Sequence, residues 1–401
     1  MNKLIVLLSL SGSYIGGAQR RYINLFKELQ KNQKDDYYLL INKSLYETCI
    51  EDGIFKNDKN IIVKKVLFEH KEKEIEIKEK KSYKTQKVKN NRLKIILGDY
   101  KYFIKQLITW FFFNVSLYKT INQYKIVSVY GVFSGGINSW FLAKILKIKF
   151  IYSYNDTGIS NISNKWIDVF SSEYWALKNA SGIDFLSEDI FYDLQKKIGR
   201  IPKEKILITP NSFIDYSRFY PRYPKKKLIS FCSRLDKIKN PLLFLEALIE
   251  LKKQNINDFN VSIIGDGECL NQMREIVIRE KFDNVIFHGE LSNPEIVLSE
   301  SCIFISIQEV NNYPSQSLIE AMACENAIVA SDVGETRKLI SENEGILVSL
   351  SKESIAKAIK ELLLNKEKCK KLGKNARERV LKEQSTKNYI EYFLLITSVN
   401  E

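Results

Sequence analysis

Residues 228–267 read LISFCSRLDKIKNPLLFLEALIELKKQNINDFNVSIIGDG. The apolar runs at its start and over 260–265 have the length of buried strands, and residues 241–253 between them repeat apolar side chains at helical spacing. Strand, helix and strand joined by short connections are typical of a parallel sheet covered by helices. The alternation continues, with strands expected at 285–287, 302–306, 327–330 and 346–348 and helices at 269–281 and 314–324.

The first half of the chain shows the same alternation. Its opening apolar run, Leu4–Leu10, is expected to be a buried strand and not a signal peptide, because a glycine turn and an amphipathic helix follow it. Further strands are expected at 37–41, 126–130, 150–154, 182–186 and 205–209. Three glycines are expected to turn the chain into a helix after the strand at 126–130: Gly131, Gly135 and Gly136.

These patterns predict an α/β protein with two doubly wound parallel-sheet domains, which also suits a length of 401 residues. We place the first domain at 1–210 and the second at 228–384. Residues 211–227, rich in proline and basic side chains, are expected to be the linker. The last helix, over 385–401, is expected to pack back on the first domain.

The formal net charge of +14 raises the question of an anionic partner. Part of the charge is local, because residues 64–92 hold eleven basic and five acidic side chains and few large apolar ones. We expect this lysine-rich insertion to be solvated. Nucleic acid is not expected as a partner, because the basic residues are not interleaved with aromatic ones as in the known modules.

Cysteine and histidine usage argues against a metal centre. The six cysteines form no C-x-x-C pair, and the two histidines are far apart in sequence. A zinc site is therefore not expected, and the scattered thiols suit the reducing cytoplasm. The sequence also has no apolar stretch of the roughly 18 residues that a membrane-spanning helix needs.

Two cations follow the strand at 228–232. Arg234 and Lys239 come just before a helix that opens with Pro241, and two cations beside a helix N-terminus are suited to hold a diphosphate. Solvated surface cations are the plainer interpretation of either residue taken alone.

The helix expected at 314–324 also starts with a proline and leaves amides and hydroxyls free at its N-terminus. Glu320 lies about a turn and a half further in, among apolar residues. A carboxylate there needs a donor, either the hydroxyls of a ribose or an internal Arg or Lys.

Glycines mark further strand ends. Gly16-Gly17 lies between the first strand and its helix and allows close approach of a ligand, but the spacing of a dinucleotide fingerprint is missing. Gly265 and Gly267 end another strand, where a nucleobase pocket and a simple turn are equally good interpretations. His288 is either a site residue or a structural histidine.

In these motifs the chain resembles retaining glycosyltransferases of the GT-B fold, in the large family of glycosyl transferases group 1 (family 4) that includes bacterial enzymes of surface polysaccharide assembly. The resemblance is strong over 228–335 and loose before residue 200. The motifs occur in family order: Gly16-Gly17, Asn211, Ser233-Arg234, Lys239-Asn240, Gly265-Asp266-Gly267, Phe287-His288-Gly289, Ser306, the helix 314–324 and Ser331–Glu335.

The resemblance implies two Rossmann-like domains that face a central cleft, and a nucleoside-diphosphate sugar of the UDP or GDP type as co-substrate, without metal or cofactor. Arg234 and Lys239 would hold the donor diphosphate, and Glu320 would bind ribose hydroxyls. The other donor-binding positions that it implies are Gly16, Gly17, Asn211, Gly265, Gly267, His288, Asn311, Ser315, Ser317 and Leu318.

Two departures from the family pattern affect the sugar-facing part. Where many relatives have a second glutamate, this chain has Asn311, and two residues are candidates to face the sugar: Asn311 itself or, after a small loop shift, Glu309. Where many relatives place a histidine, it has Asn155-Asp156 at a strand end, and Asp156 is the candidate for contacting sugar or acceptor.

By this resemblance the protein transfers a hexose-type sugar, with retention, to a glycan or lipid-linked acceptor in cell-surface polysaccharide or lipopolysaccharide synthesis. The leaving diphosphate would itself help to deprotonate the acceptor. An aromatic helix around residues 110–113 suits peripheral contact with an anionic membrane at the inner face of the cell membrane. Ordinary core packing of these aromatics is the alternative.

Two other function classes stay open. A degenerate transferase would bind a nucleotide sugar or a partner enzyme without turnover, which the departure at Asn311 motivates. A nicotinamide-dependent oxidoreductase would also have doubly wound sheets, but the fingerprint glycines and the acidic ribose residue are missing from the first unit.

Overall fold

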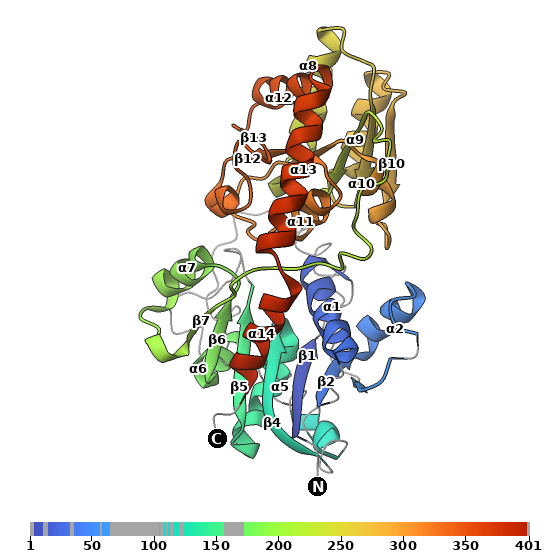
Figure 1. The fold of residues 1–401 in the computed structure, drawn as a ribbon. Coiled ribbons are helices and arrows are strands. Elements are labelled where there is room, and N and C mark those ends of the chain that lie inside the picture. Colours follow the sequence, from blue (N-terminus) through green and yellow to red (C-terminus); the bar gives the residue numbers. More distant parts are fainter. Residues whose placement is uncertain are drawn as a thin grey trace, which may run out of the picture. The chain divides into compact units, whose positions relative to one another are not determined.

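The computed structural model describes residues 4–10, 15–32, 36–56, 58–64, 104, 108, 111–112, 115–119, 124–155 and 172–398. The chain divides into two compact units. Unit 1 comprises residues 1–209 and 390–401, and unit 2 comprises residues 210–389. Each has its own parallel sheet flanked by helices (Figure 1), so the prediction of two doubly wound α/β domains is confirmed.

Unit 1 contains a seven-stranded sheet in the order β3-β2-β1-β4-β5-β6-β7. The neighbouring strands are parallel, for example Leu8 opposite Leu39 and Tyr130 opposite Ile151. The strands are β1 (Leu4–Leu10), β2 (Tyr37–Asn42), β3 (Ile61–Lys64), β4 (Lys125–Val132), β5 (Lys149–Tyr154), β6 (Gly182–Phe185) and β7 (Ile206–Ile208). The helices within the described residues of this unit are α1 (Gly17–Lys31), α2 (Lys43–Glu51), α5 (Phe133–Leu146), α6 (Ser172–Asn179), α7 (Glu188–Ile198) and the short η2 (Lys203–Lys205).

Two details of unit 1 differ from the sequence-based expectation. Strand β3 was not expected; it is only four residues long and pairs with β2 at the edge of the sheet. The turn expected at Gly135 and Gly136 is wrong, because α5 already begins at Phe133 and both glycines lie inside it. Most of the expected insertion at 64–92 and the candidate Asp156 lie outside the described residues.

Unit 2 contains a six-stranded parallel sheet in the order β10-β9-β8-β11-β12-β13. The strands are β8 (Leu228–Cys232), β9 (Asn260–Ile264), β10 (Val285–Gly289), β11 (Ile303–Ser306), β12 (Ala327–Ser331) and β13 (Gly345–Val348). The helices are α8 (Pro241–Lys253), α9 (Leu270–Arg279), α10 (Glu295–Glu300), α11 (Gln316–Ala323), α12 (Lys352–Leu364) and α13 (Lys366–Glu383), with short η3 (Lys237–Lys239) and η4 (Gly334–Lys338). The last helix, α14 (Thr386–Thr397), begins in unit 2 and ends in unit 1.

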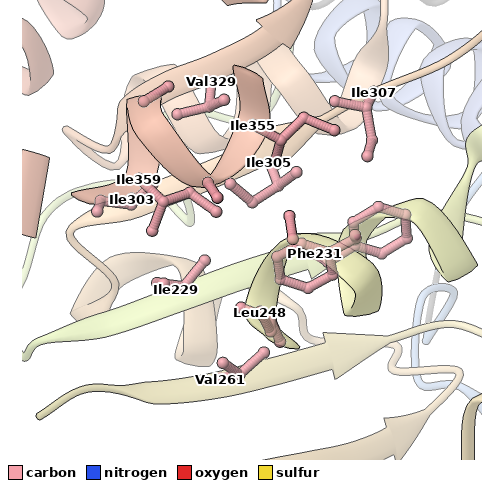
Figure 2. Packing of buried hydrophobic residues seen from close by; sticks show 14 of the residues in the cluster. Ile229, Phe231, Leu248, Val261, Ile303, Ile305, Ile307, Val329, Ile355 and Ile359 are labelled. Carbon is pink, nitrogen blue, oxygen red and sulfur yellow. The ribbon is translucent and has the colours of Figure 1, made fainter. Parts of the chain in front are cut away.

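Alternate residues of the unit 2 strands face two apolar clusters, as the two-residue period of a strand requires. Ile303 and Ile305 of β11 belong to one cluster, with Ile355 of α12 (Figure 2). Phe304 belongs to the other cluster, which α11 and α13 cover. Both faces of this sheet are buried, which explains why its strands are continuous apolar runs.

The segment 211–227 is more than a connection. Ile214 and Phe219 are buried and belong to the second apolar cluster of unit 2, where they pack with α11 and α13. Phe213 is also fully buried, and its ring lies 4.8 Å from that of Tyr389. The structure thus makes residues 211–227 part of unit 2.

The end of helix α14 belongs to unit 1. Phe393 packs against Tyr130 of β4, with ring centroids 5.0 Å apart, and the carbonyl of Thr397 accepts a hydrogen bond from Ser128 at 2.9 Å. Tyr392 donates to the buried carboxylate of Asp184 at 2.6 Å. Burial raises the pKa of Asp184, although hydroxyl donors and a nearby arginine act in the opposite direction.

Candidate functional site

The loops that follow four strands of unit 2 are joined by hydrogen bonds at the carboxyl edge of the sheet. The Leu235 amide, after β8, donates to Asp266 after β9 at 2.8 Å, and the Glu309 amide, after β11, donates to Ile238 at 3.1 Å. Ser331 at the end of β12 is fully buried, and its hydroxyl bonds both the amide and the carbonyl of Gln308 at 2.9 Å. Ligands of open α/β sheets usually bind at this edge.

Two glycines make the contact between the loops after β8 and β9 possible. Gly265 has φ +129°, and a Cβ there would lie 1.9 Å from the carbonyl oxygen of Ser233. A Cβ on Gly267 would lie 2.6 Å from the backbone of Leu235. Both predicted positions therefore have a clear structural role in shaping the loops.

Lys239 is a cation that lies among these joined loops at the carboxyl edge of the sheet. It ends the short helix η3, whose first turn is capped by the Asp236 carboxylate accepting from the Lys239 amide at 3.2 Å. The Lys239 Nζ donates to the Gln308 side chain at 3.0 Å. Burial lowers the pKa of Lys239 to about 8, with Asp236 acting against and Arg234 with that change.

Arg234 lies on the outside of the same loop. Its side chain is 58% exposed, and its guanidinium forms an ion pair with Asp236 at 3.0 Å. Asp236 thus holds the Arg234 guanidinium and the backbone of Lys239. An exposed arginine beside a half-buried lysine gives this loop two donors for an anion, one of them poorly hydrated.

Helix α11 contributes its N-terminus to the candidate site. Within the described part of the chain, the hydroxyl of the N-cap residue Ser315 makes no capping hydrogen bond to this helix. The amides of the first turn, including Ser317 and Leu318, have no acceptor inside the helix. They point out of its N-terminal end, where an anion is stabilised. Glu320, one turn further, is only 2% exposed.

Asn311 holds the loop between β11 and α11 in place. Its Oδ1 accepts from the Tyr313 amide at 3.0 Å and from the Glu335 amide at 3.2 Å. Gly334 has φ +52°, and a Cβ there would lie 2.4 Å from the Asn311 Cβ, so the two loops are in close contact. Glu309 is exposed, with its backbone tied to η3.

Sequence reasoning missed three side chains of this region: Gln308, Glu335 and Lys338. Gln308 is 4% exposed and bonds Lys239, while Glu335 is 8% exposed, forms an ion pair with Lys338 and lies 3.4 Å from the Asn311 amide nitrogen. The signal for Gln308 was its place two residues after the end of β11. Glu335 follows a glycine in the Ser331–Glu335 motif, which gave no sign of its partner.

Two other predicted positions are held by local contacts. A ring nitrogen of His288 bonds the Ser262 hydroxyl of β9 at 3.0 Å. Asn211 is 5% exposed and donates to the carbonyls of Ser212 and Ser385 at 2.6 and 2.8 Å. These bonds fix both side chains to neighbouring segments of unit 2.

Unit 1 places the glycine loop at the start of α1. Gly16 is the N-cap with extended backbone, and its carbonyl accepts from the Arg20 amide at 3.0 Å. Further along α1, the Tyr22 hydroxyl bonds Ser153 of β5 at 2.6 Å and lies 3.4 Å from Asn155. The carboxyl edge of this sheet therefore carries polar groups beside an open helix N-terminus.

The described residues contain no group of three or more His, Cys, Asp or Glu side chains arranged to hold a metal ion. In the same part of the chain, every helix is too short or too polar to span a bilayer.

Comparisons with known proteins agree with this geometry. Residues 213–379 match the protein family described as Glycosyl transferases group 1. An α-1,4-N-acetyl-D-galactosaminyltransferase of Campylobacter jejuni is 31% identical over 197 residues, which are 48% of this chain and 53% of that enzyme. Its name gives a diphospho-undecaprenol-linked glycan as acceptor. The chain spans about half the length of the curated relatives it matches.

Solved structures show the fold over the whole chain. Anabaena HepE in complex with UDP and glucose has a TM-score of 0.71 and 14% identity, with all of both chains covered. WaaG, a glycosyltransferase involved in lipopolysaccharide biosynthesis, has a TM-score of 0.66 and 12% identity, covering 99% of this chain and 100% of its own. The two-unit architecture of this chain is the GT-B fold.

Proposed function

We propose that this chain, which has the GT-B fold and carries a glycosyl transferases group 1 domain, is a glycosyltransferase. It moves a hexose-type sugar from a nucleoside diphosphate to a glycan or lipid-linked acceptor in surface polysaccharide synthesis. The observation that carries the proposal is the half-buried ammonium of Lys239, held by Gln308 where the strand ends converge. A poorly hydrated cation gains strongly from a phosphate ligand.

In this proposal the donor diphosphate lies against the loop after β8 and the first turn of α11. Lys239 and Arg234 bind the phosphate oxygens, and the amides of Ser317 and Leu318 donate to them. These groups stabilise the negative charge that develops on the leaving diphosphate, which is the main demand of the reaction. No metal ion and no resident cofactor take part in the reaction as we propose it.

The sugar is transferred with retention of its anomeric configuration. The leaving phosphate takes the proton of the acceptor hydroxyl as the new bond forms on the same face of the sugar. This arrangement needs no side-chain base close to the anomeric carbon, which suits a site where Asn311 is engaged with the backbone of Tyr313 and Glu335. Glu309 and Asp156 remain candidates for contacts with the sugar or acceptor.

The remaining donor contacts follow from the same placement. Glu320 binds the ribose hydroxyls, and the loops shaped by Gly265 and Gly267 border the nucleobase. Gly16 and Gly17, at the start of α1, remain candidates for donor contacts. UDP is the proposed nucleotide, since HepE was solved with UDP and with UDP-glucose.

The acceptor is proposed to be a lipid-linked glycan, as in the name of the Campylobacter jejuni relative. Six exposed apolar side chains support membrane contact from the cytoplasmic side. They are Ile104, Ile108, Phe111, Phe112, Val115 and Tyr118. Their exposure contradicts ordinary core packing for Phe111 and Phe112, which are 57% and 54% exposed. The net charge of +14 suits an anionic leaflet.

A second candidate is a degenerate transferase that binds the nucleotide sugar without turnover. It is favoured by one observation, the engagement of Asn311 with two backbone amides at a position where many relatives have a glutamate. Donor hydrolysis or transfer by the purified protein excludes it.

Thermal shift of the full chain with UDP, GDP, ADP, CMP and NAD tests the donor site. A ligand at 100 times its dissociation constant stabilises by about 2.7 kcal/mol. We expect a shift with UDP that Arg234→Ala and Glu320→Ala both reduce and that Lys237→Ala, in the exposed part of η3, leaves unchanged. A shift with NAD alone, or with none of the nucleotides, would show the proposal to be wrong.

A further inference from the structure

Three cysteines of unit 2 surround one lysine at the amino edge of the sheet, opposite the candidate donor site. Cys302 directly precedes β11, Cys324 ends α11, and Cys369 lies in the first turn of α13. Lys225 donates to the backbone carbonyl of Ser301 at 2.7 Å and to that of Cys324. The Lys225 charge also interacts with the three thiols.

Two of these cysteines are in contact. The Cys369 Sγ donates to the carbonyl oxygen of Cys302 at 3.5 Å. The Cys302 Sγ lies 3.6 Å from the Leu228 carbonyl. The two residues are 67 positions apart in sequence, so the fold alone brings them together.

The two thiols differ in the way that a nucleophilic and a resolving thiol differ. The neighbouring Cys369 side chain lowers the pKa of Cys302, with Lys225 acting in the same direction, whereas Cys302 and burial raise the pKa of Cys369. Cys302 is partly exposed, whereas Cys369 is 7% exposed. Cys324 is the internal contrast, because it is fully buried and burial raises its pKa to about 12.

We propose that Cys302 and Cys369 form an oxidative modification site at which a peroxide converts the two thiols into a disulfide. The Cys302 thiolate attacks one peroxide oxygen, the O–O bond breaks, and the sulfur becomes a sulfenic acid while the leaving oxygen takes a proton. The Cys369 sulfur then attacks the Cys302 sulfur, the S–O bond breaks, and the hydroxyl leaves as water with the Cys369 proton. The two thiols lose two electrons, and the peroxide gains them.

The cysteine site and the candidate donor site lie at opposite edges of the unit 2 sheet, so they are far apart. From Cys302 to Gln308 the chain runs the length of β11 and beyond, roughly 20 Å at 3.3 Å per residue. The bond would close a covalent ring from β11 through α11, β12, β13 and α12 to α13 (Figure 1). Such a long ring restricts the unfolded chain, so the oxidised protein should be the more stable form.

The test treats the reduced, full-length protein near pH 7 with an equimolar amount of hydrogen peroxide. Free thiols counted after unfolding should fall from six to four, and a peptide map should show one linked pair that contains Cys302 and Cys369. The melting temperature should rise on the order of 10 °C and return after treatment with a dithiol reductant.

Matched variants locate the reaction. Cys302→Ser and Cys369→Ser should each abolish the linked pair, and Lys225→Met should slow its formation several-fold. Cys324→Ser and Cys49→Ser, which replace buried cysteines outside the pair, should leave the rate unchanged. Linkage between other cysteines, or Cys302 oxidised beyond sulfenic acid with Cys369 still free, would overturn the proposal. The map of the unmodified protein decides the question even where a serine variant fails to fold.

Discussion

Replacing Lys239 by methionine removes the ammonium but keeps most of the volume of the side chain. In the proposed complex this ammonium bonds a donor phosphate, and a hydrogen bond to a charged group contributes about 1.5–3 kcal/mol. The dissociation constant of UDP should therefore rise by about 10- to 150-fold. Isothermal titration calorimetry at pH 7 measures this change directly.

The same substitution should leave the empty protein about as stable as before. A pKa of about 8 in place of 10.5 means that the empty site disfavours the Lys239 ammonium by about 3 kcal/mol at pH 7. Methionine removes this cost but leaves the buried Gln308 carbonyl without its donor, which costs about 1–3 kcal/mol. The two effects nearly cancel, so the melting temperature without ligand should change little.

Lys237→Met is the matched control. Lys237 lies in the same short helix η3 and is exposed, so its loss should change UDP affinity less than about twofold. If Lys239→Met binds UDP as tightly as the unmodified protein, or if Lys237→Met weakens binding equally, the assignment of Lys239 to the diphosphate is refuted.

Three further predictions follow from other features. UDP affinity should fall as the pH rises through about 8, because Lys239 then loses the proton that binds phosphate, and calorimetry from pH 6.5 to 9.5 should show this dependence absent from Lys239→Met. Gly265→Ala should lower the free energy of unfolding by more than about 2 kcal/mol in denaturant titration, because the new Cβ meets a backbone oxygen at 1.9 Å; an unchanged value would contradict the strain at φ +129°. The double variant Phe111→Ser, Phe112→Ser should lose binding to anionic vesicles in a flotation assay, whereas Leu364→Ser, at a still more exposed position of unit 2, should not. If both variants bind vesicles as the unmodified protein does, the proposed membrane contact is wrong.

The sequence predicted the two-domain α/β fold because its signals are local and repeated. Buried parallel strands are continuous apolar runs, as at Ile303–Ser306, and the helices between them have regular apolar spacing. Short edge elements were missed: β3 (Ile61–Lys64) has four residues and lacks a clear pattern. The segment 211–227 was interpreted as a linker because its prolines and lysines are conspicuous, while burial of Phe213 and Phe219 depends on partners far along the chain.

The residues of the candidate site were predicted better than the contacts between them. Lys239 was identified from its place after a strand, but its partner Gln308 is 69 positions away. The contact between Asn311 and Glu335 likewise joins two loops, 24 positions apart, and no local sequence pattern predicts it. Long-range pairs of this kind depend on the sheet order, which periodicity does not reveal.

The most direct test of the central proposal is a transfer assay with purified full-length protein, UDP-N-acetylgalactosamine and UDP-glucose as donors, and a glycan on diphospho-undecaprenol as acceptor. Mass spectrometry should detect an acceptor extended by one sugar, in the same anomeric configuration as the donor by NMR, and Lys239→Met and Glu320→Ala should reduce its formation at subsaturating donor. If the protein binds UDP but neither transfers nor hydrolyses any donor tried, the proposal of an active enzyme is wrong. The degenerate transferase, which binds the nucleotide sugar without turnover, is then the better account.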